Sequence, residues 1–510
     1  MYLRKKFIAM SKQVRVRFAP SPTGPLHIGG VRTALFNYLF AKKNNGVFFL
    51  RIEDTDQNRF VAGAEEYIME ALEWLGIAPD ETIGKNEKFG PYRQSERKDL
   101  YQQYAAELIN SGNAYYAFDT AEALDAARKL EEEQGKTFIY NHTNREKLDT
   151  SLVISADETA KRIADGEHYV IRFKTPVNET LHLHDIIRGD VKFETNLLDD
   201  KVLFKSDGMP TYHLANIVDD HLMETSHVIR GEEWLPSMPL HVLLYRAFGW
   251  KAPEFAHLPL IMKPVGNGKL SKRDGDKMGF PVFPLDWKTA EGVSSGYREK
   301  GFFPEAVINF LALLGWNDGT DKELFSLEEL VAAFDLNRVH KAGAKFDPEK
   351  NKWFNHQYLI KQEDATLAKA YAPILAEKGF SVDESVLTKV VSLIKERAHF
   401  VSEFWEMSDF FFVAPTAYDE KASKNWKEET PALMQELISV VEEITDFSSM
   451  NNETIVKDWM TKNEIGMGKV MQPFRLSLVG ALKGPHLFDI VEVIGKDETI
   501  KRIQKAIATL

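Results

Sequence analysis

The sequence predicts an α/β fold with a parallel sheet, an α+β insertion and an all-helical carboxy-terminal region. Residues 14–76 follow the order strand, loop, helix, strand, helix, which is how a parallel sheet with helical crossovers begins. Residues 98–209 carry alternating patterns typical of antiparallel strands. After about residue 300 we find only helical periodicity.

The amino-terminal elements can be placed in order. VRVRFA (14–19) alternates and is β-branched, which indicates a strand. The loop PSPTGPLHIGG (20–30) follows, and residues 29–44 have apolar side chains at helical spacing up to a closing NNG. VFFLRIED (47–54) is a second expected strand. Residues 63–76 are a second amphipathic helix with acids in its first turn.

The later elements are read from the same patterns. Within the insertion, LDAARKLEEEQGK is a charged helix, and HYVIRFKTP, LHLHDIIRGDVKF and KVLFKSDG are expected strands. The α/β character returns at 210–250. PEAVINFLALLGW opens with proline at a helix start, and SLEELVAAF has serine followed three residues later by glutamate, a capping signature.

Composition narrows the function classes. The chain has 510 residues, enough for three or four domains, and no cysteine, which excludes disulfides, thiolate metal sites and a cysteine nucleophile. The net charge of −12 disfavours a small nucleic-acid-coating module, but a large enzyme needs only one basic groove. The apolar run FIAM is too short for a signal peptide, and no run reaches the ~18 residues of a membrane span. We therefore expect a cytoplasmic protein.

The loop PSPTGPLHIGG has the composition of an anion-binding turn. Prolines stiffen it, and glycines permit tight turns and close backbone approach. It connects a strand to a helix at the edge where parallel sheets bind ligands, and helix amino termini favour anions. His27 could donate a hydrogen bond to a phosphate there. The alternative is a tight connection in which His27 only caps the helix.

A second loop, NGKLSKRDGDK (267–277), strengthens the phosphate hypothesis. It places Lys269, Lys272 and Arg273 around Ser271 between glycines. Lysines at this spacing can hold a polyphosphate as mobile charges, although basic surface loops are usually only solvated. The pairing with the upstream histidine loop makes the signal specific.

These two loops resemble the signatures of class I aminoacyl-tRNA synthetases. LHIGG resembles the HIGH loop and KLSKR the KMSKS loop. RFAPSPTGPLHIGG, FFLRIEDTD, GPYRQSER, LFKSDGMPTYHLANIVDDHLM, HVIRGEEWLPS and HVLLYRAFGW are similar to the bacterial-type glutamyl-tRNA synthetase branch. The similarity is strong over residues 14–275 and looser through the helical remainder.

The resemblance implies a domain order. A Rossmann-type catalytic domain would be split into residues 1–97 and 210–251, with an acceptor-stem-binding domain inserted at 98–209. A stem-contact region with the KLSKR loop would occupy 252–345. An all-α anticodon-binding region would occupy 346–510.

The resemblance also implies the activity of a glutamate–tRNA ligase. ATP would activate L-glutamate to glutamyl-adenylate, and the glutamyl group would pass to the 3′ end of tRNA(Glu). ATP would bring Mg²⁺. We expect no zinc, since YYAFDT stands where some relatives begin a cysteine zinc site, and no membrane partner. The family suggests a monomer.

Four other functions fit parts of the sequence. A glutaminyl-tRNA synthetase would end in a β-barrel region, and a short transferase that modifies a tRNA base would lack the last third. A non-enzymatic synthetase-derived tRNA-binding protein would be expected to lose the phosphate-handling residues, which are present. A small-molecule adenylating ligase would not need the helical carboxy-terminal residues.

The resemblance transfers roles to individual residues. The catalytic residues would be His27, Lys269 and Lys272. The glutamate site would comprise Arg17, Ala19, Ser21, Glu53, Tyr212, Asn216 and Arg230. The ATP site would comprise His27, Gly29, Gly30, Glu233, Ile261, Lys269, Leu270, Ser271, Lys272 and Arg273. Arg397 would contact tRNA.

The chemistry of glutamate agrees with this set. Two carboxylates need cations, which Arg17 and Arg230 can supply through forked hydrogen bonds, and Glu53 can receive the ammonium. Tyr212 and Asn216 would share a helix face. Each residue also has a structural alternative. Arg17 could form a surface ion pair, and Tyr212 could be a core residue. Glu53 could pair with Arg51 or Arg59, and Arg230 could pair with Glu232.

Some features depart from the family or have no assigned role. Gly30 and Arg273 replace the last residues of the two signatures, as is usual in the glutamate branch. The segment DKMGFPVFPLDWKTAEGVSSGYREK is longer than usual, and we expect a surface insertion. Arg397 could equally be a solvated arginine.

Overall fold

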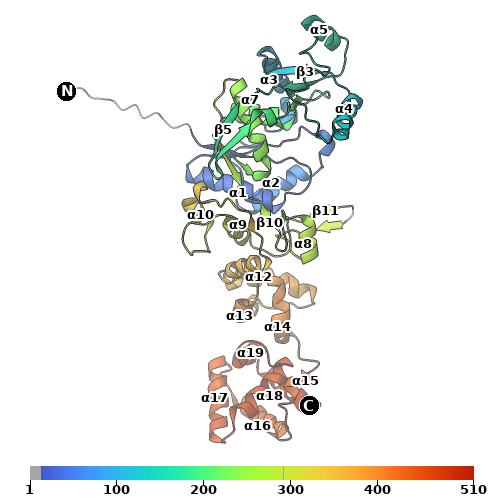
Figure 1. Ribbon diagram of the computed structural model, residues 1–510. Helices are drawn as coiled ribbons and strands as arrows, with labels where there is room; N and C mark the ends of the chain where they lie inside the picture. The colour runs from blue at the N-terminus through green and yellow to red at the C-terminus, as the bar shows by residue number, and fades with distance from the viewer. Residues whose placement is uncertain (1–12, 291) are drawn as a thin grey trace, which may run out of the picture. The chain divides into compact units, whose positions relative to one another are not determined.

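The structure, a computed structural model, describes residues 13–290 and 292–510. The amino-terminal run that is too short for a signal peptide lies outside the described residues. The chain divides into two units, one formed by the residues up to Lys300 with Val307–Pro348, the other by Gly301–Ala306 with Glu349–Leu510 (Figure 1). The finer domain boundaries expected from the sequence remain a prediction.

The helices and strands have the following bounds. The strands are β1 Arg15–Phe18, β2 Val47–Leu50, β3 Ala114–Ala117, β4 Val170–Phe173, β5 Thr180–Asp185, β6 Gly189–Glu194, β7 Val202–Phe204, β8 His227–Gly231, β9 Glu254–Leu258, β10 Ile261–Met262, β11 Trp287–Thr289, β12 Gly292–Ser294 and β13 Ala344–Lys345. The first helices are α1 Ile28–Lys43, α2 Ala64–Trp74, α3 Lys98–Asn110, α4 Ala121–Glu133, α5 Ala156–Ala164, α6 Tyr212–Leu222, α7 Met238–Ala247, α8 Lys272–Met278, α9 Pro304–Leu313 and α10 Leu327–Ala333. The remaining helices are α11 Pro348–Leu359, α12 Asp364–Glu377, α13 Glu384–Ile394, α14 Phe404–Phe412, α15 Glu420–Ser423, α16 Thr430–Glu443, α17 Ser449–Lys462, α18 Met467–Val479, α19 Leu487–Ile494 and α20 Lys496–Thr509.

A parallel arrangement of strands forms the centre of the first unit, as the sequence predicts. Strand β1 pairs in parallel with β2, with Arg15 opposite Val47, and β8 pairs in parallel with β9. Strand β8 lies beside β1, where the backbone N–H of Ser226 donates to the carbonyl of Arg15 at 2.9 Å. Helix α1 packs on β1, β2 and β8. The carboxyl ends of β1, β2 and β8 therefore meet at one edge.

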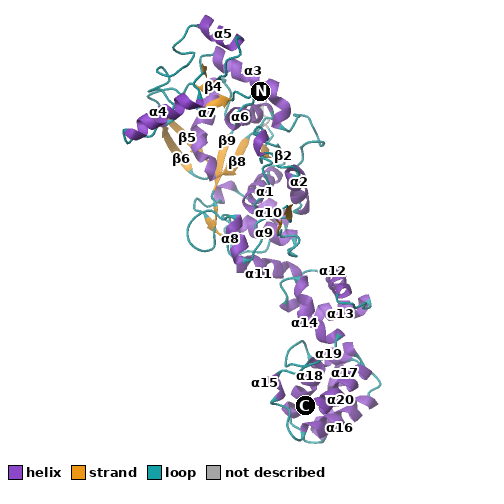
Figure 2. Ribbon diagram, turned by 90° about the vertical axis from the view of Figure 1, so that its right-hand side faces the viewer, coloured by secondary structure: helices purple, strands orange, loops and turns teal. Residues whose placement is uncertain are grey.

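The hairpin β5–β6 continues this arrangement. Its strands are antiparallel, and Asp185, the last residue of β5, is paired in parallel with Phe255 of β9. Figure 2 shows β5 and β6 beside β9 and β8. The chain segment that we assigned to the insertion thus supplies strands to the same sheet that carries β8.

The rest of the insertion is antiparallel, as expected from its alternating patterns. Strands β3, β4 and β7 form a separate sheet in that order. Helix α4 carries no buried residue, in keeping with its charged sequence. Buried Ile171, Phe173 and Leu203 belong to the same apolar core as Leu214 and Val218 of α6, so this sheet is anchored to that helix.

The expectation of purely helical structure after residue 300 is wrong at one point. Strand β13 pairs in parallel with β10, with Ala344 opposite Ile261. A strand of two residues is too short to produce an alternating pattern, so periodicity could not reveal it. Elsewhere the helical patterns are confirmed, and Ser326 and Glu329 form the expected capping box at α10. In the described residues 349–510 there are helices and no strands.

The long segment after the KLSKR loop forms the hairpin β11–β12. It is fastened to α2 because the hydroxyl of Tyr67 donates to the carbonyl of Leu285 at 2.6 Å and accepts from its N–H. Val293 in this hairpin is exposed.

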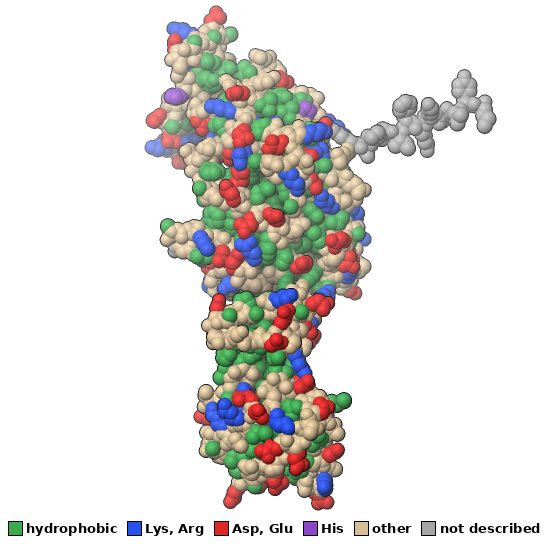
Figure 3. Space-filling model, turned by 180° about the vertical axis from the view of Figure 1, so that it is seen from behind, with side chains coloured by type: hydrophobic (Ala, Val, Ile, Leu, Met, Phe, Trp, Pro, Cys, Tyr) green, Lys and Arg blue, Asp and Glu red, His purple; other side chains and the backbone are tan. Residues whose placement is uncertain are grey.

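The surface of the described residues shows no single-sign charged region on the face in Figure 3, where acidic and basic side chains are interspersed. Among the helices of residues 13–290 and 292–510, none is long and apolar enough to cross a membrane. The same residues contain no group of three or more His, Cys, Asp or Glu side chains that could hold a metal ion.

Candidate active site

A cavity of about 840 Å³ lies at the edge of the sheet where β1, β2 and β8 end. It is lined by every residue of the expected glutamate site, namely Arg17, Ala19, Ser21, Glu53, Tyr212, Asn216 and Arg230. It is also lined by most of the expected ATP site, namely His27, Gly29, Gly30, Glu233, Ile261, Lys269 and Leu270. Segments from three separate parts of the chain therefore converge on one space.

Four expected residues do not line this cavity. Ser271, Lys272 and Arg273 are exposed at the amino end of α8. Ser271 caps that helix, and its hydroxyl donates to Asp274 at 2.6 Å. Arg397 belongs to the other unit, on a single 3-10 turn, where its Nη1 donates to the carbonyl of Gly484 at 3.1 Å.

His27 caps helix α1 and also keeps a free donor. Its Nδ1 accepts from the N–H of Gly29 at 3.2 Å, while its buried Nε2 has no hydrogen-bond partner among the described residues. Because Nδ1 is an acceptor, the ring proton of the neutral form lies on Nε2. The capping alternative is therefore correct, and it is compatible with a donor function, since the cap fixes the tautomer that points N–H away from the helix.

Burial, together with the nearby ammonium of Lys269, lowers the pKa of His27 to about 4. The ring is thus neutral at physiological pH and acts as a hydrogen-bond donor without carrying charge. Lys269 supplies positive charge at this end of the cavity. Lys269 ion-pairs with Glu233 at 2.9 Å, and it lowers the pKa of Glu233 even though burial acts in the opposite direction.

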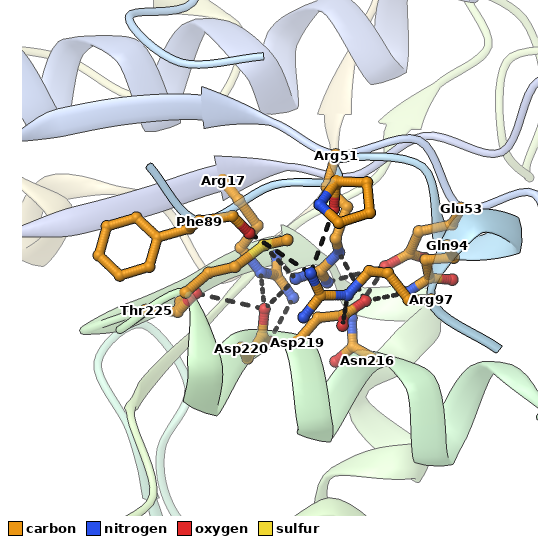
Figure 4. A network of polar contacts seen from close by, with 12 residues as sticks. Arg17, Arg51, Glu53, Phe89, Gln94, Arg97, Asn216, Asp219, Asp220 and Thr225 are labelled. Atoms are coloured by element: carbon orange, nitrogen blue, oxygen red, sulfur yellow. Dashed lines mark hydrogen bonds and ion pairs between the residues drawn. The ribbon is translucent and has the colours of Figure 1, made fainter. Parts of the chain in front are cut away.

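Behind the cavity lies a buried cluster of three arginines and three acids, which we call the ion network: Arg17, Arg51, Arg97, Glu53, Asp219 and Asp220 (Figure 4). Asp220 accepts from Arg17 at 3.0 and 3.1 Å and from Nη1 of Arg51 at 2.9 Å. Arg51 also donates to Glu53 at 2.9 Å. Arg17 is therefore in a buried ion pair, not the surface pair considered from the sequence.

The second acid of the ion network, Asp219, is equally occupied. It accepts from Arg97 at 2.7 Å, from the amide of Gln94 at 2.9 Å and from the hydroxyl of Tyr101 at 2.8 Å. Burial acts to raise the pKa of Asp220, but the adjacent Arg17 and Arg51 outweigh it, and the pKa of Asp220 lies below its usual range. With three cations and three anions, the ion network has no net charge.

Glu53 faces both the ion network and the cavity. Its Oε1 accepts from Arg51 and from the side-chain amide of Asn216 at 3.1 Å. Its Oε2 takes no hydrogen bond from the part of the chain that the structure describes, so this oxygen can accept an ammonium. Burial raises the pKa of Glu53 despite Arg51 and Arg17, and an incoming cation would favour the ionised form. Of the two alternatives from the sequence, Arg51 is the partner and Arg59 is not.

Arg230 differs from the arginines of the ion network because all of its partners are neutral. Its Nε donates to Nε2 of His257 at 3.0 Å, its Nη1 to the hydroxyl of Tyr212 at 3.1 Å, and its Nη2 to the carbonyl of Trp234 at 3.3 Å. Nη1 also lies 3.2 Å from Nδ1 of His241. No carboxylate of the described residues pairs with it, and Glu232 instead pairs with Arg188.

A buried guanidinium without a counter-charge is costly unless an anion joins it. Arg230 is only 5% exposed and lines the cavity, so the arrangement favours binding of a carboxylate at this point. The hydroxyl of Tyr212 already accepts from Arg230, which leaves its own hydrogen to donate. Tyr212 is half-buried and is covered by Trp234, with ring centroids 4.3 Å apart, so it lines the cavity and is not a core residue.

Several residues that organise the site were missed by sequence reasoning. Asp219 and Asp220 are adjacent acids in the otherwise buried stretch of α6, and two carboxylates inside an apolar helix face were a readable signal. His257 gave no such signal, because a single histidine in a strand has many possible roles.

The chain is similar in sequence to known proteins over nearly its whole length. Residues 13–353 match the catalytic domain of class I tRNA synthetases (E and Q), and residues 365–507 match an anticodon binding domain. A glutamate–tRNA ligase of Flavobacterium johnsoniae is 87% identical over 501 residues, covering 98% of this chain and 100% of the relative. One of Christiangramia forsetii is 63% identical over 504 residues, with coverage of 98% and 100%.

A solved structure is similar as well. A glutamate tRNA ligase from Elizabethkingia meningosepticum, crystallised in complex with its amino acid, superposes with a TM-score of 0.95 at 54% identity. The match covers 98% of this chain and all of that chain.

The ion network makes a prediction about stability. Arg51→Met should lower the free energy of unfolding of the first unit by about 3–5 kcal/mol, because removing one partner leaves buried carboxylates unpaired. Urea unfolding of the full chain would measure this. Arg128→Met is the matched control, because Arg128 forms an exposed pair with Asp125 and should cost about 1 kcal/mol or less. Equal effects of the two substitutions would contradict the prediction.

The environment of His27 makes a prediction about protonation. Nitrogen-detected NMR of ¹⁵N-histidine protein should show His27 as the Nε2–H tautomer with a pKa of about 4. Between that value and the 6.5 of an ordinary histidine, the unfolded chain binds the extra proton. The stabilising contribution of neutral His27 should therefore be complete above pH 6.5 and decline as the pH falls towards 4. Titration near 6.5 would show that the ring is solvated.

Proposed function

Because this chain belongs to the family of class I tRNA synthetases for glutamate and glutamine, we propose that the cavity is where it activates glutamate. The enzyme is a glutamate–tRNA ligase. It joins L-glutamate to ATP as glutamyl-adenylate with release of pyrophosphate, and then transfers the glutamyl group to the 3′ end of tRNA(Glu). Each of these steps can be assigned to residues of the cavity and of the KLSKR loop.

The uncompensated charge of Arg230 is the observation that carries the proposal. Glutamate brings two carboxylates and one ammonium. A carboxylate pairs with Arg230 and accepts from the hydroxyl of Tyr212, while the ammonium is received by Glu53. Arg17 contributes through Nη1, because its Nε and Nη2 are already bound to Asp220. Ala19, Ser21 and Asn216 complete this site.

The same arrangement selects against glutamine. An amide group would place N–H donors against the donors of Arg230, and it would leave the guanidinium without a counter-ion. Leaving a buried polar group unpaired costs about 1–3 kcal/mol, and more when the group is charged. The preference for glutamate over glutamine therefore depends on the charge of Arg230, which no carboxylate of the described residues neutralises.

Phosphate chemistry is assigned to the other end of the cavity. His27 donates its Nε2–H to the reacting α-phosphate, and Lys269 and Lys272 hold the departing pyrophosphate. Gly29, Gly30, Glu233 and Ile261 contact the nucleoside, and Leu270, Ser271 and Arg273 complete the ATP site on the KLSKR loop. No covalent enzyme intermediate is required, because positioning and charge stabilisation lower the barrier.

We place Mg²⁺ with the ATP phosphates. It would arrive as part of the substrate complex, where it shares the charge of the phosphates. We assign no zinc to the inserted domain, because the chain has no cysteine to bind it. We further propose a cytoplasmic monomer.

Recognition of tRNA is assigned to the helical unit. The exposed guanidinium of Arg397 is proposed to contact a base of the anticodon, since RNA loops are recognised by stacking and hydrogen bonding of unpaired bases. A glutaminyl-tRNA synthetase with a β-barrel ending does not fit the described residues 349–510, which form helices only.

The experiment that tests the proposal is aminoacylation with purified protein, ATP and Mg²⁺. Labelled glutamate or glutamine is supplied with separate transcripts of glutamate and glutamine tRNA. Charging of glutamate tRNA with glutamate alone is expected, and the second transcript reports whether tRNA(Gln) is also misacylated. Binding of tRNA without charging would favour a non-enzymatic tRNA-binding protein.

Arg230→Ala should raise the KM for glutamate in this assay by at least about thirtyfold, which corresponds to about 2 kcal/mol for a buried charged contact. The KM for ATP should change little. Arg246→Ala is the control, because Arg246 is an exposed arginine paired with Glu179 and should leave both constants unchanged. An unchanged glutamate KM in Arg230→Ala would place the carboxylate elsewhere.

Lys272→Ala should slow adenylate formation by a factor on the order of 10²–10³, since one stabilising group of the transition state is lost. ATP–pyrophosphate exchange with tRNA present measures this step. Lys277→Ala, an exposed lysine on the same helix, should retain normal exchange. If Lys272→Ala exchanges as fast as Lys277→Ala, the KLSKR loop does not bind the phosphates.

A further inference from the structure

We propose that Asp185 and His257 are positioning residues that orient the guanidinium of Arg230 towards the glutamate carboxylate. This inference rests on the role proposed above for Arg230. It adds two residues, one of them on the insertion hairpin, that do not line the cavity.

The three side chains form a buried line. His257 lies on β9 and Asp185 ends β5, and both are fully buried. Nδ1 of His257 lies 2.6 Å from Oδ2 of Asp185, and Nε2 of His257 lies 3.0 Å from Nε of Arg230. Arginine Nε always carries hydrogen, so Nε2 of His257 must be the acceptor. The ring is therefore neutral with its proton on Nδ1, donated to Asp185.

Asp185 is fixed by its surroundings. Its Oδ1 accepts from the backbone N–H groups of Ile187 at 3.0 Å and Arg188 at 2.8 Å, and its Oδ2 accepts from the N–H of His257 at 3.1 Å. These bonds stabilise the carboxylate, and the pKa of Asp185 lies below its usual range although burial acts to raise it. An ionised Asp185 in turn keeps the proton of His257 on Nδ1.

The other neighbours of Arg230 hold it less firmly. Tyr212 is half-buried, and the carbonyl of Trp234 is at 3.3 Å. His241 can accept at Nδ1 if it donates from Nε2 to His213, whose Nδ1 is 3.1 Å away, but no acid in the described part of the chain fixes that tautomer. His257 is the neighbour whose acceptor state is set by a carboxylate.

A neutral acceptor suits this position for a physical reason. A carboxylate bonded directly to Arg230 would neutralise it and compete with the substrate. An imidazole orients Nε while leaving the positive charge and the Nη groups available. The negative charge of Asp185 is kept one ring away, where it sets the tautomer of His257 without pairing with Arg230.

Two substitutions at His257 separate orientation from packing. In His257→Gln, the side-chain oxygen can occupy the place of Nε2 and accept from Arg230. In His257→Asn, the shorter amide can donate to Asp185 but does not reach Arg230. Loss of a hydrogen bond to a charged group is worth about 1.5–3 kcal/mol, so we expect the Asn variant to raise the glutamate KM by about tenfold or more. The Gln variant should stay within about threefold of wild type, and the KM for ATP should be unaffected in both.

Asp185→Asn keeps the shape of the side chain at position 185 and tests whether its charge sets the tautomer of His257. Its amide oxygen would retain the N–H bonds of Ile187 and Arg188, which puts the NH₂ group against Nδ1 of His257. The ring proton would move to Nε2 and confront Nε of Arg230. We expect a rise in glutamate KM like that of the Asn variant at 257.

The outcomes distinguish this inference from the proposed function. If Arg230→Ala leaves the glutamate KM unchanged, the carboxylate site itself is wrong. If Arg230→Ala raises it but the Asn and Gln variants at 257 behave alike, the positioning role is overturned. Should the variants not fold, nitrogen NMR of the wild-type enzyme decides: an Nδ1–H tautomer at His257 supports the inference, and an Nε2–H tautomer overturns it.

Discussion

The balance of charge in the buried ion network is the constraint on which the first unit of the structure depends. Arg51 is completely buried and bonds both Glu53 after β2 and Asp220 on α6, and Asp220 in turn binds Arg17 on β1. These contacts tie the ends of two strands to the helix across the sheet edge. An unpaired buried charge is costly, so the ion network favours the relative placement of β1, β2 and α6 that pairs every one of its members.

Arg230 in the cavity wall lacks the charge balance of the ion network. Within the described residues, Arg17, Arg51 and Arg97 have acidic partners, whereas Arg230 has only neutral ones. The charges of the ion network are thus balanced within the fold, whereas Arg230, which we propose binds the substrate carboxylate, has no carboxylate partner among the described residues. Local sequence does not distinguish these roles, since Arg17 and Arg230 both lie in a strand that ends at the cavity.

The end of the cavity that we propose for the phosphates is organised differently. His27 is neutral, and its acceptor nitrogen is occupied by the start of α1, so the loop converts a helix cap into an oriented donor. The cationic groups that we propose for the phosphates are Lys269, on a loop, and Lys272, at the exposed start of a short helix. Fixed neutral donors and movable cations suit a reaction in which charge develops on phosphates and then departs with pyrophosphate.

Consecutive residues were enough to predict the alternating strands and helices of the sheet and the helical carboxy-terminal region, and the resemblance to a known family supplied most members of the cavity. Periodicity, caps and loop composition are local properties, which is why they can be read along the chain. The partners of each charged group could not be read in this way. Asp220 lies 203 residues from Arg17, and Asp185 lies 72 residues from His257, so neither pairing leaves a local pattern. The strand β13 was missed for a related reason, since two residues paired with a distant strand have no period of their own. Folding alone brings together the atoms that decide which arginine has an acidic partner and which tautomer a histidine adopts.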